Sequence, residues 1–222
     1  MLKLIFPSIV FIANLLVQEG AFASASQIIG CDKCSIENES FNNLNETNFT
    51  ILDSFFHSVD LRGETLKSFI ISGNDASYLG FSVKHIENGV FSNNNFASLF
   101  IEKSTVKNLL FVDNRLSQPY LSGIFVQVQF RGNAIFEGSL FNIKIINSSF
   151  HDSELKGLKF ENCLLENTVF VGSRLDRVFF KNCDMKNALF INATLRQVVF
   201  ENVTNMRAEN FINSDLIDVI GM

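Results

Sequence analysis

The sequence predicts an all-β protein: a right-handed quadrilateral parallel β-helix whose chain completes one coil every twenty residues. Three observations predict this fold. Large apolar residues recur at every fifth position from residue 51 to residue 216, similar residues recur at every twentieth position, and asparagines form columns of their own. A period of five fits neither an α-helix, with about 3.6 residues per turn, nor a flat strand, with a period of about two. The chain is therefore expected to turn a corner every five residues.

The five-residue period covers 34 positions, and all of them are hydrophobic. A run from Ile51 to Leu121 is followed, after a one-residue deletion, by a run from Phe125 to Phe200, and a one-residue insertion precedes Met206. Because 47% of the chain is hydrophobic, chance would give such a series with a probability on the order of 10⁻¹¹. The pattern predicts about eight coils over residues 51–216.

The twenty-residue period predicts that like side chains form ladders along the axis, because stacked parallel strands lie about 4.8 Å apart. The expected core ladders are Phe130, Phe150, Phe170 and Phe190; Leu155, Leu175 and Leu195; and Phe160, Phe180 and Phe200. Asparagine tolerates left-handed backbone angles, and its amides can bond one another along the axis. A polar ladder at one corner is therefore expected, formed by Asn142, Asn162, Asn182 and Asn202.

The second run resembles the pentapeptide-repeat family, whose repeat is roughly Ala-(Asp/Asn)-Leu-x-x. Segments such as Ser153-Glu154-Leu155, Cys163-Leu164-Leu165 and Ala193-Thr194-Leu195 carry the resemblance. Membership implies that the central residue and the residue two before it point inward, the latter being small. Residues 123–216 follow this pattern well.

The first half follows the family pattern only at the central position, and it is interpreted as a degenerate continuation of the repeat. Four larger or charged residues stand there where a small one is expected: Glu64, Phe69, Lys84 and Leu109. The phase slip around residues 117–125 contains Pro119, which cannot donate a backbone hydrogen bond. We expect a bulge or a protruding loop at this point.

The first 25 residues have the pattern of a secretory signal peptide. Lys3 supplies a positive charge, Leu4 to Val17 are apolar, and Ala21-Phe22-Ala23 is a small-x-small cleavage site. A membrane anchor is the alternative, but the apolar stretch would reach only about 21 Å as a helix, short of a hydrocarbon core of about 30 Å. We therefore expect export to the periplasm or the extracellular space, with no membrane span after cleavage.

Residues 26–50 are expected to be a polar leader that caps the N-terminal end of the stack. Residues 217–222 are expected to be an apolar tail that covers the last coil or packs on a second copy of the chain. Caps are expected because open ends of a parallel stack expose unpaired strand edges. A lipobox at residues 28–31, with Cys31 lipidated, is a minor alternative for the N-terminus, because polar Gln18 and Glu19 separate it from the apolar stretch.

The four cysteines form two pairs with different expectations. Cys31 and Cys34 form a CxxC pair for which a local disulfide is favoured over a redox or zinc site, because neither a second pair nor a supporting scaffold is visible. Cys163 and Cys183 stand twenty residues apart at the small inward position and should stack directly. The expected Cα–Cα distance would allow a disulfide. Buried free thiols are favoured because, in the family that the sequence resembles, cysteine is a common small residue at this inward position.

No catalytic, cofactor-binding or metal-binding site is expected. The net charge of −5 does not indicate a protein that binds nucleic acid. His57, His85 and His151 fall at outward repeat positions without a cysteine or carboxylate at ligand spacing, and no phosphate loop or nucleophile motif is present. The protein is expected not to be an enzyme.

The expected function is that of a non-enzymatic interaction or structural module that binds an unknown protein partner or forms a homodimer. A contiguous outward apolar patch is the candidate interface, because such patches commonly mark binding sites. It consists of Val169, Val171, Leu189 and Ile191 on one face, with Phe179 and Val199 on the next.

Two alternatives remain. The best-known family members resemble duplex DNA and inhibit DNA gyrase, which the resemblance makes a candidate. Export and the charge balance argue against it, since residues 131–200 hold nine Lys and Arg against seven Asp and Glu. The other alternative is a secreted effector.

Overall fold

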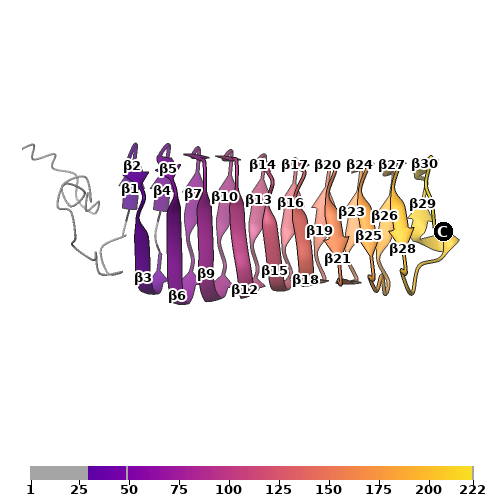
Figure 1. Cartoon of the computed structure of the whole chain (residues 1–222), viewed down its shortest axis with the longest axis horizontal. Coiled ribbons are helices and arrows are strands. Elements are labelled where there is room, and N and C mark those ends of the chain that lie inside the picture. Colours follow the sequence, from indigo (N-terminus) through magenta and orange to yellow (C-terminus); the bar gives the residue numbers. More distant parts are fainter. Residues whose placement is uncertain (1–29, 49, 222) are drawn as a thin grey trace, which may run out of the picture.

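Almost every described residue lies in a short parallel strand or at the corner that follows it. The computed structural model describes residues 30–48 and 50–221, and its strands stack along one long axis from β1 to β30 (Figure 1). The predicted all-β parallel solenoid with a twenty-residue coil is confirmed, because each strand pairs in parallel with the strand one coil away. The described residues contain no α-helix, only the 3₁₀ turn η2 (Ala208–Asn210).

Face 1 of the solenoid is a ten-stranded sheet. Its strands, in order along the axis, are β1 (Gly30–Asp32), β4 (Thr50–Leu52), β7 (Ile70–Ser72), β10 (Val90–Ser92), β13 (Leu110–Val112), β16 (Gln129–Arg131), β19 (Ser149–His151), β23 (Val169–Val171), β26 (Leu189–Ile191) and β29 (Phe211–Ile212).

Face 2 is a second sheet of ten strands. They are β2 (Ser35–Glu37), β5 (Phe55–His57), β8 (Asp75–Ala76), β11 (Asn95–Phe96), β14 (Arg115–Ser117), β17 (Ala134–Phe136), β20 (Glu154–Lys156), β24 (Arg174–Asp176), β27 (Thr194–Arg196) and β30 (Asp215–Ile217).

Faces 3 and 4 share the third sheet, because its first six strands bend round a corner without a break. These long strands are β3 (Ser40–Thr47), β6 (Val59–Lys67), β9 (Leu79–Glu87), β12 (Leu99–Lys107), β15 (Tyr120–Val126) and β18 (Ser139–Ile146). Beyond β18 the sheet divides. Face 3 continues as β21 (Lys159–Glu161), β25 (Phe179–Lys181) and β28 (Val199–Glu201), and face 4 as β22 (Leu164–Glu166) and single bridges at Asp184 and Thr204.

The corners are made by single residues in the left-handed region. Non-glycine corner residues have φ between 45° and 63°, and asparagine is the commonest of them. Asparagine and glycine enter this region at the lowest cost, and the short polar side chain of asparagine can bond locally. The five-residue period therefore follows from one left-handed residue after each three-residue strand.

The core is filled by the central residues of the five-residue segments. All of them from Ile51 to Phe200 are buried. The phenylalanines on face 1 stack ring on ring, with centroids 4.6 Å apart for Phe130 and Phe150, 4.9 Å for Phe150 and Phe170, and 4.7 Å for Phe170 and Phe190. On face 3, Phe180 stacks between Phe160 and Phe200 at 4.7 and 5.1 Å. Leu155, Leu175 and Leu195 are also in register and fully buried.

The stack begins earlier than predicted. Residues 30–47, placed in the polar leader, form the strands β1, β2 and β3 of a first coil. Ile36, Phe41 and Leu44 are buried in it and join the core of the next coil. The expectation of a separate leader is corrected accordingly: these residues add a coil before the about eight coils predicted over residues 51–216, and two of the sheets contain ten strands. The predicted signal peptide, residues 1–25, lies outside the described residues.

In the irregular first half, a residue of the neighbouring coil accommodates each unusually large or charged residue discussed below. Phe69 is buried in a small slot because Gly89 stands in the same column one coil later, where a Cβ would lie 2.3 Å or less from two atoms of the Phe69 ring. Glu64 and Lys84 point outward and pair with each other at 2.7 Å. Val83 is buried instead of Lys84, because β9 runs through this corner with simple alternation.

The phase slip near residue 120 is a bulge and not a protruding loop. β15 pairs with β12 and β18 on its two sides, with a register shift just before Gly123. Gly123 has a φ of 114°, and a Cβ there would meet the backbone of Ser104. The deletion is thus absorbed inside one strand, and the stack continues on both sides of it.

Candidate interaction surfaces

Face 1 is the least charged side of the solenoid. Between β4 and β26 its outward positions carry one charged residue, Arg131, and one histidine, His151. The other outward residues are Thr50, Leu52, Ile70, Ser72, Val90, Ser92, Leu110, Val112, Gln129, Ser149, Val169, Val171, Leu189 and Ile191. A flat β-surface of this composition resembles the apolar centre of a protein–protein interface more than an ordinary solvated face.

The predicted interface patch is divided between two faces. Val169, Val171, Leu189 and Ile191 lie together on β23 and β26 of face 1 and are half-buried. Phe179 and Val199 lie on β25 and β28 of the third sheet. Ten residues separate Val169 from Phe179, which is two corners of a four-sided coil, so face 3 is opposite to face 1 and not next to it. The expectation of one contiguous patch was wrong.

The C-terminal end of the stack leaves core-type residues uncovered. Leu216, which occupies a central position, is 38% exposed, and Ile217 and Ile220 are 46% and 64% exposed. The tail adds to one edge only: the N–H of Ile220 donates to the carbonyl of Val198, and the N–H of Phe200 donates to the carbonyl of Ile220. An apolar recess of about 280 Å³, lined chiefly by Met206, Ala208, Phe211 and Leu216, remains at this end.

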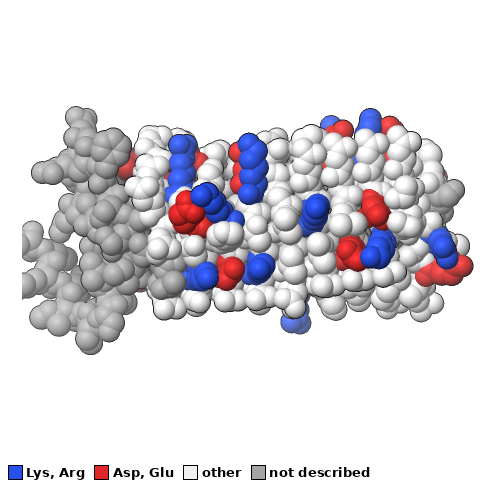
Figure 2. Space-filling view, turned by 90° about the horizontal axis from the view of Figure 1, so that it is seen from below, with Lys and Arg blue, Asp and Glu red and all other residues white. Residues whose placement is uncertain are grey.

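Charged residues are paired between neighbouring coils. Lys67 pairs with Glu87 at 3.3 Å, Lys186 with Glu166 at 2.6 Å, and Lys181 with Glu201 at 3.2 Å. The hydrogen bond to Glu166 and the charge of that carboxylate raise the pKa of Lys186. On the side drawn in Figure 2, basic and acidic residues lie in small mixed groups separated by uncharged surface. That side presents no continuous field of one sign.

The predicted corner ladder of asparagines is hydrogen-bonded along the axis. Asn162 donates to Asn142, Asn182 to Asn162, and Asn202 to Asn182, at 3.3, 3.1 and 3.2 Å between amide nitrogen and oxygen. These side chains are exposed. They position the corners, and nothing about them indicates a ligand site.

A second asparagine ladder is buried inside the solenoid, and the sequence did not identify it as core. It is formed by Asn74, Asn94, Asn114 and Asn133. Each of the first three donates from Nδ2 to Oδ1 of the next, at 3.0, 2.9 and 3.0 Å. The sequence shows that asparagine recurs at a spacing of twenty at positions 74, 94 and 114. Polar residues are ordinarily expected to face water, so this recurrence does not predict that the asparagines are buried.

The histidines take outward positions, as the repeat predicts. Nδ1 of His57 lies 2.9 Å from Oγ of Ser77, and Nδ1 of His151 lies 2.8 Å from a carboxylate oxygen of Asp152. Asp152 is the corner residue that follows His151 in the sequence, so the expectation that no carboxylate stands beside a histidine is corrected here. No group of three or more potential metal ligands occurs among residues 30–48 and 50–221.

The structure joins Cys163 and Cys183 by a disulfide across two neighbouring coils. Their Cα atoms are 4.5 Å apart, within the usual range for a disulfide. The favoured expectation of free thiols is corrected. Cys34 is also disulfide-bonded, while the side chain of Cys31 is not among those described, so the pairing of Cys31 with Cys34 stays a prediction.

We expect the double substitution of Cys163 and Cys183 by alanine to lower the free energy of unfolding by roughly 3 kcal/mol, the amount given by closing a loop of about 20 residues. Alanine fits the slot, because Ala188 and Ala193 occupy equivalent positions. Thermal unfolding of the two proteins measures the loss. Alkylation of both cysteines in the denatured, unreduced wild-type protein would contradict the assignment.

Comparison with known proteins gives a class for this architecture and a family match for part of the chain. The class is that of β-solenoid repeat proteins, which the parallel stack defines. Residues 148–187 and 163–202 match the family model described as "Pentapeptide repeats (8 copies)". Residues 148–202 of this chain are therefore pentapeptide repeats. No curated protein sequence matches it.

Solved structures with similar folds include pentapeptide-repeat proteins and a glycoside hydrolase. QnrB1, a plasmid-mediated fluoroquinolone resistance protein, is 15% identical with a TM-score of 0.37, covering 86% of this chain and 90% of that one. HetL from Nostoc sp. strain PCC 7120, involved in heterocyst differentiation regulation, is 13% identical with a TM-score of 0.34, covering 82% and 87%. A GH87 α-1,3-glucanase from Streptomyces thermodiastaticus strain HF3-3 is 9% identical with a TM-score of 0.42, covering 86% and 49%.

Among the described residues, no helix is long and apolar enough to cross a membrane.

Proposed function

We propose that this protein is a non-enzymatic, exported interaction module that binds a protein partner, or a second copy of itself, through face 1. The observation that carries the proposal is the composition of that face: one charged residue on its outward positions from β4 to β26. Exposed apolar surface on a soluble protein commonly marks an interface, because covering it releases water. The proposed export depends on residues 1–25 and is a separate part of the proposal.

The strongest part of face 1 lies near the C-terminal end. There Val169, Val171, Leu189 and Ile191 lie on adjacent strands, and Ile212 on β29 extends the same surface with 41% of its area exposed. Parallel strands hold these side chains in fixed rows about 4.8 Å apart. A partner would therefore meet a rigid surface that requires little ordering on binding.

The duplex-mimicking alternative finds no support in the charge distribution. Ion pairs between coils neutralise Lys67, Lys181 and Lys186 against carboxylates of the neighbouring coil. A mimic of DNA requires continuous negative surface, since the phosphate backbone dominates what DNA-binding proteins recognise. Face 1 is largely apolar and does not present such a negative surface.

We expect the substitution Leu189→Asp to reduce partner recovery, or self-association, by at least about tenfold, because a carboxylate would be desolvated at the centre of the interface. The measurement is affinity capture with the purified mature chain, together with the oligomeric state by light scattering. The matched control is Leu164→Asp, which places the same change at a half-buried outward position on face 4. Equal recovery and equal oligomeric state for wild type and Leu189→Asp would remove face 1 as the interface.

A further inference from the structure

A second recess lies at the corner between faces 4 and 1, where the chain leaves the regular repeat. Strand pairing has a spacing of twenty residues from β23 to β26, and of twenty-one from Phe190 on β26 to Phe211 on β29. The extra residue is accommodated between Thr204 and Phe211 by an extended Arg207 and the turn η2. The displaced chain leaves an opening of about 580 Å³.

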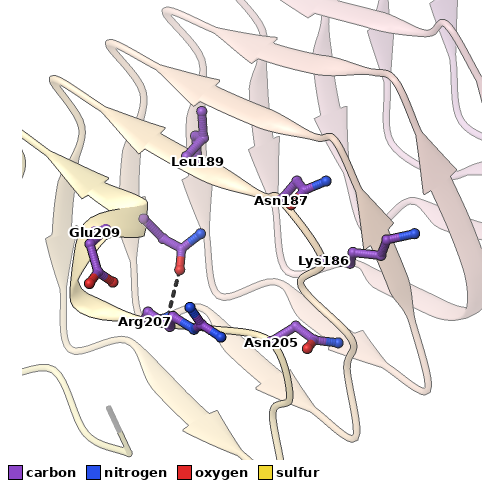
Figure 3. Close-up of a pocket in the computed structure, with 7 residues that line it drawn as sticks. Lys186, Asn187, Leu189, Asn205, Arg207 and Glu209 are labelled. Atoms are coloured by element: carbon purple, nitrogen blue, oxygen red, sulfur yellow. Dashed lines mark hydrogen bonds between the residues drawn. The ribbon is translucent and has the colours of Figure 1, made fainter.

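Polar and charged side chains from two coils surround this opening (Figure 3). The coil before the insertion contributes Lys186, Asn187 and Leu189, and the inserted segment contributes Asn205, Arg207, Glu209 and Asn210. Small-molecule sites in proteins commonly occupy about 300–1,000 Å³ and combine apolar surface with a few convergent polar groups. The recess falls in this range.

The inserted segment is held in place by its own asparagines. Oδ1 of Asn210 accepts the backbone N–H of Arg207 at 2.6 Å, and its Nδ2 donates to the carbonyl of Ala188 at 2.6 Å. Nδ2 of Asn205 donates to a carboxylate oxygen of Asp184 at 2.7 Å. The backbone of Arg207 is therefore fixed, and hydrogen bonds also hold the side-chain amides of Asn205 and Asn210 on either side of it.

Two cationic side chains line the recess in a chain whose net charge is −5. Lys186 and Arg207 line it together with one carboxylate, that of Glu209. The charge of Lys186 is balanced by Glu166, which lies 2.6 Å away outside the lining, so Arg207 is the cation left for a ligand. Arg207 forms no ion pair with any residue of the described chain, so its planar guanidinium is available for a carboxylate or phosphate, which it matches with two parallel hydrogen bonds.

The amides add acceptors to these donors. Nδ2 of Asn187 donates to Oδ1 of Asn167 at 3.0 Å, and Nδ2 of Asn205 is used by Asp184. The side-chain carbonyl oxygens of Asn187 and Asn205, two residues that line the recess, are thereby left as acceptors. Acceptors require donors on the ligand, and hydroxyl groups supply them.

We propose that the recess binds a small hydroxylated molecule through its acidic group, the carboxylate or phosphate of an acidic sugar. Arg207 holds the acidic group, and the amide oxygens of Asn187 and Asn205 accept hydroxyl hydrogen bonds. This site is independent of the proposed binding of a protein to face 1, although Leu189 borders both.

The test is titration of the purified mature chain, followed by NMR chemical shifts or calorimetry, with glucuronate, glucose 6-phosphate and neutral glucose. We expect at least one acid to bind, with the largest shifts at the amides of Asn187 and Asn205, and glucose to bind at least about tenfold more weakly. Stronger binding of glucuronate identifies a carboxylate ligand, and stronger binding of glucose 6-phosphate identifies a phosphate.

The variant Arg207→Gln should weaken binding of the acid at least about tenfold, whereas the control Arg196→Gln, an exposed arginine on face 2, should leave it unchanged. Equal binding of glucose and the acids, no binding of either acid, or equal affinity in wild type and Arg207→Gln would overturn the proposal. Since the thermal stability of both variants is measured alongside, a folding defect would be detected separately.

Discussion

Replacement of Asn94 by alanine is expected to lower the free energy of unfolding by about 3–5 kcal/mol. Oδ1 of Asn94 accepts both the backbone N–H and Nδ2–H of Asn74, and its own Nδ2 donates to the carbonyl of Ile71 and to Asn114. Alanine would leave the buried N–H of Asn74 without a partner and open a cavity in the middle of the stack. Denaturant or thermal unfolding measures the loss.

The matched control is Asn162→Ala in the exposed ladder. Asn162 makes the same amide-to-amide bonds but in contact with water, which replaces them. The expected loss there is about 1 kcal/mol, mostly the cost of a left-handed alanine at a φ of 54°. Similar losses for the two variants would show that the inner ladder is not a buried hydrogen-bond network.

Replacement of Phe170 by alanine is expected to cost about 3–5 kcal/mol. The ring is fully buried between Phe150 and Phe190, with centroids 4.9 and 4.7 Å away, and meets Phe180 edge to face at 6.4 Å. Alanine removes two stacking contacts and leaves a cavity that the rigid neighbouring coils cannot close. Leucine should cost only about 1–2 kcal/mol because it keeps most of the volume.

Hydrogen exchange adds a spatial test to the Phe170 prediction. In a solenoid each coil contacts only its neighbours, so damage should spread mainly to the adjacent coils. Amides of β19 and β26 should exchange faster in Phe170→Ala, while those of β4 and β7 should change little. Uniformly faster exchange along the chain would contradict a stack held together by neighbour contacts.

The architecture was predictable because each five-residue segment repeats the same physical task. A central apolar residue, a strand and a left-handed corner recur so often that single exceptions such as Ala76 do not hide the period. The first coil was missed although Ile36 and Phe41 continue the same phase, because Glu46 occupies the next central position and polar residues surround them. The polar composition of this segment therefore hid the five-residue spacing that continues through it.

The surfaces were less predictable than the core. The hydrophobic pattern correctly indicates that Phe179 points outward beside a buried Phe180, but a patch also depends on which corners separate its members. Two corners place Phe179 opposite Val169. The recess beside Arg207 could not be predicted, because it results from the path of one inserted residue and from the hydrogen bonds of Asn210, neither of which has a sequence pattern.

The backbone closes a four-sided coil about every twenty residues, so that equivalent corners lie in one straight column. Nitroxide labels on cysteines placed at Ser68 and Asn167, two exposed corner residues five coils apart, test it by electron–electron double resonance. A four-sided coil predicts a single narrow distance near 24 Å between the label sites, from five strand spacings of about 4.8 Å. A broad distribution, or a distance beyond about 35 Å, the span of roughly seven such spacings, would contradict it.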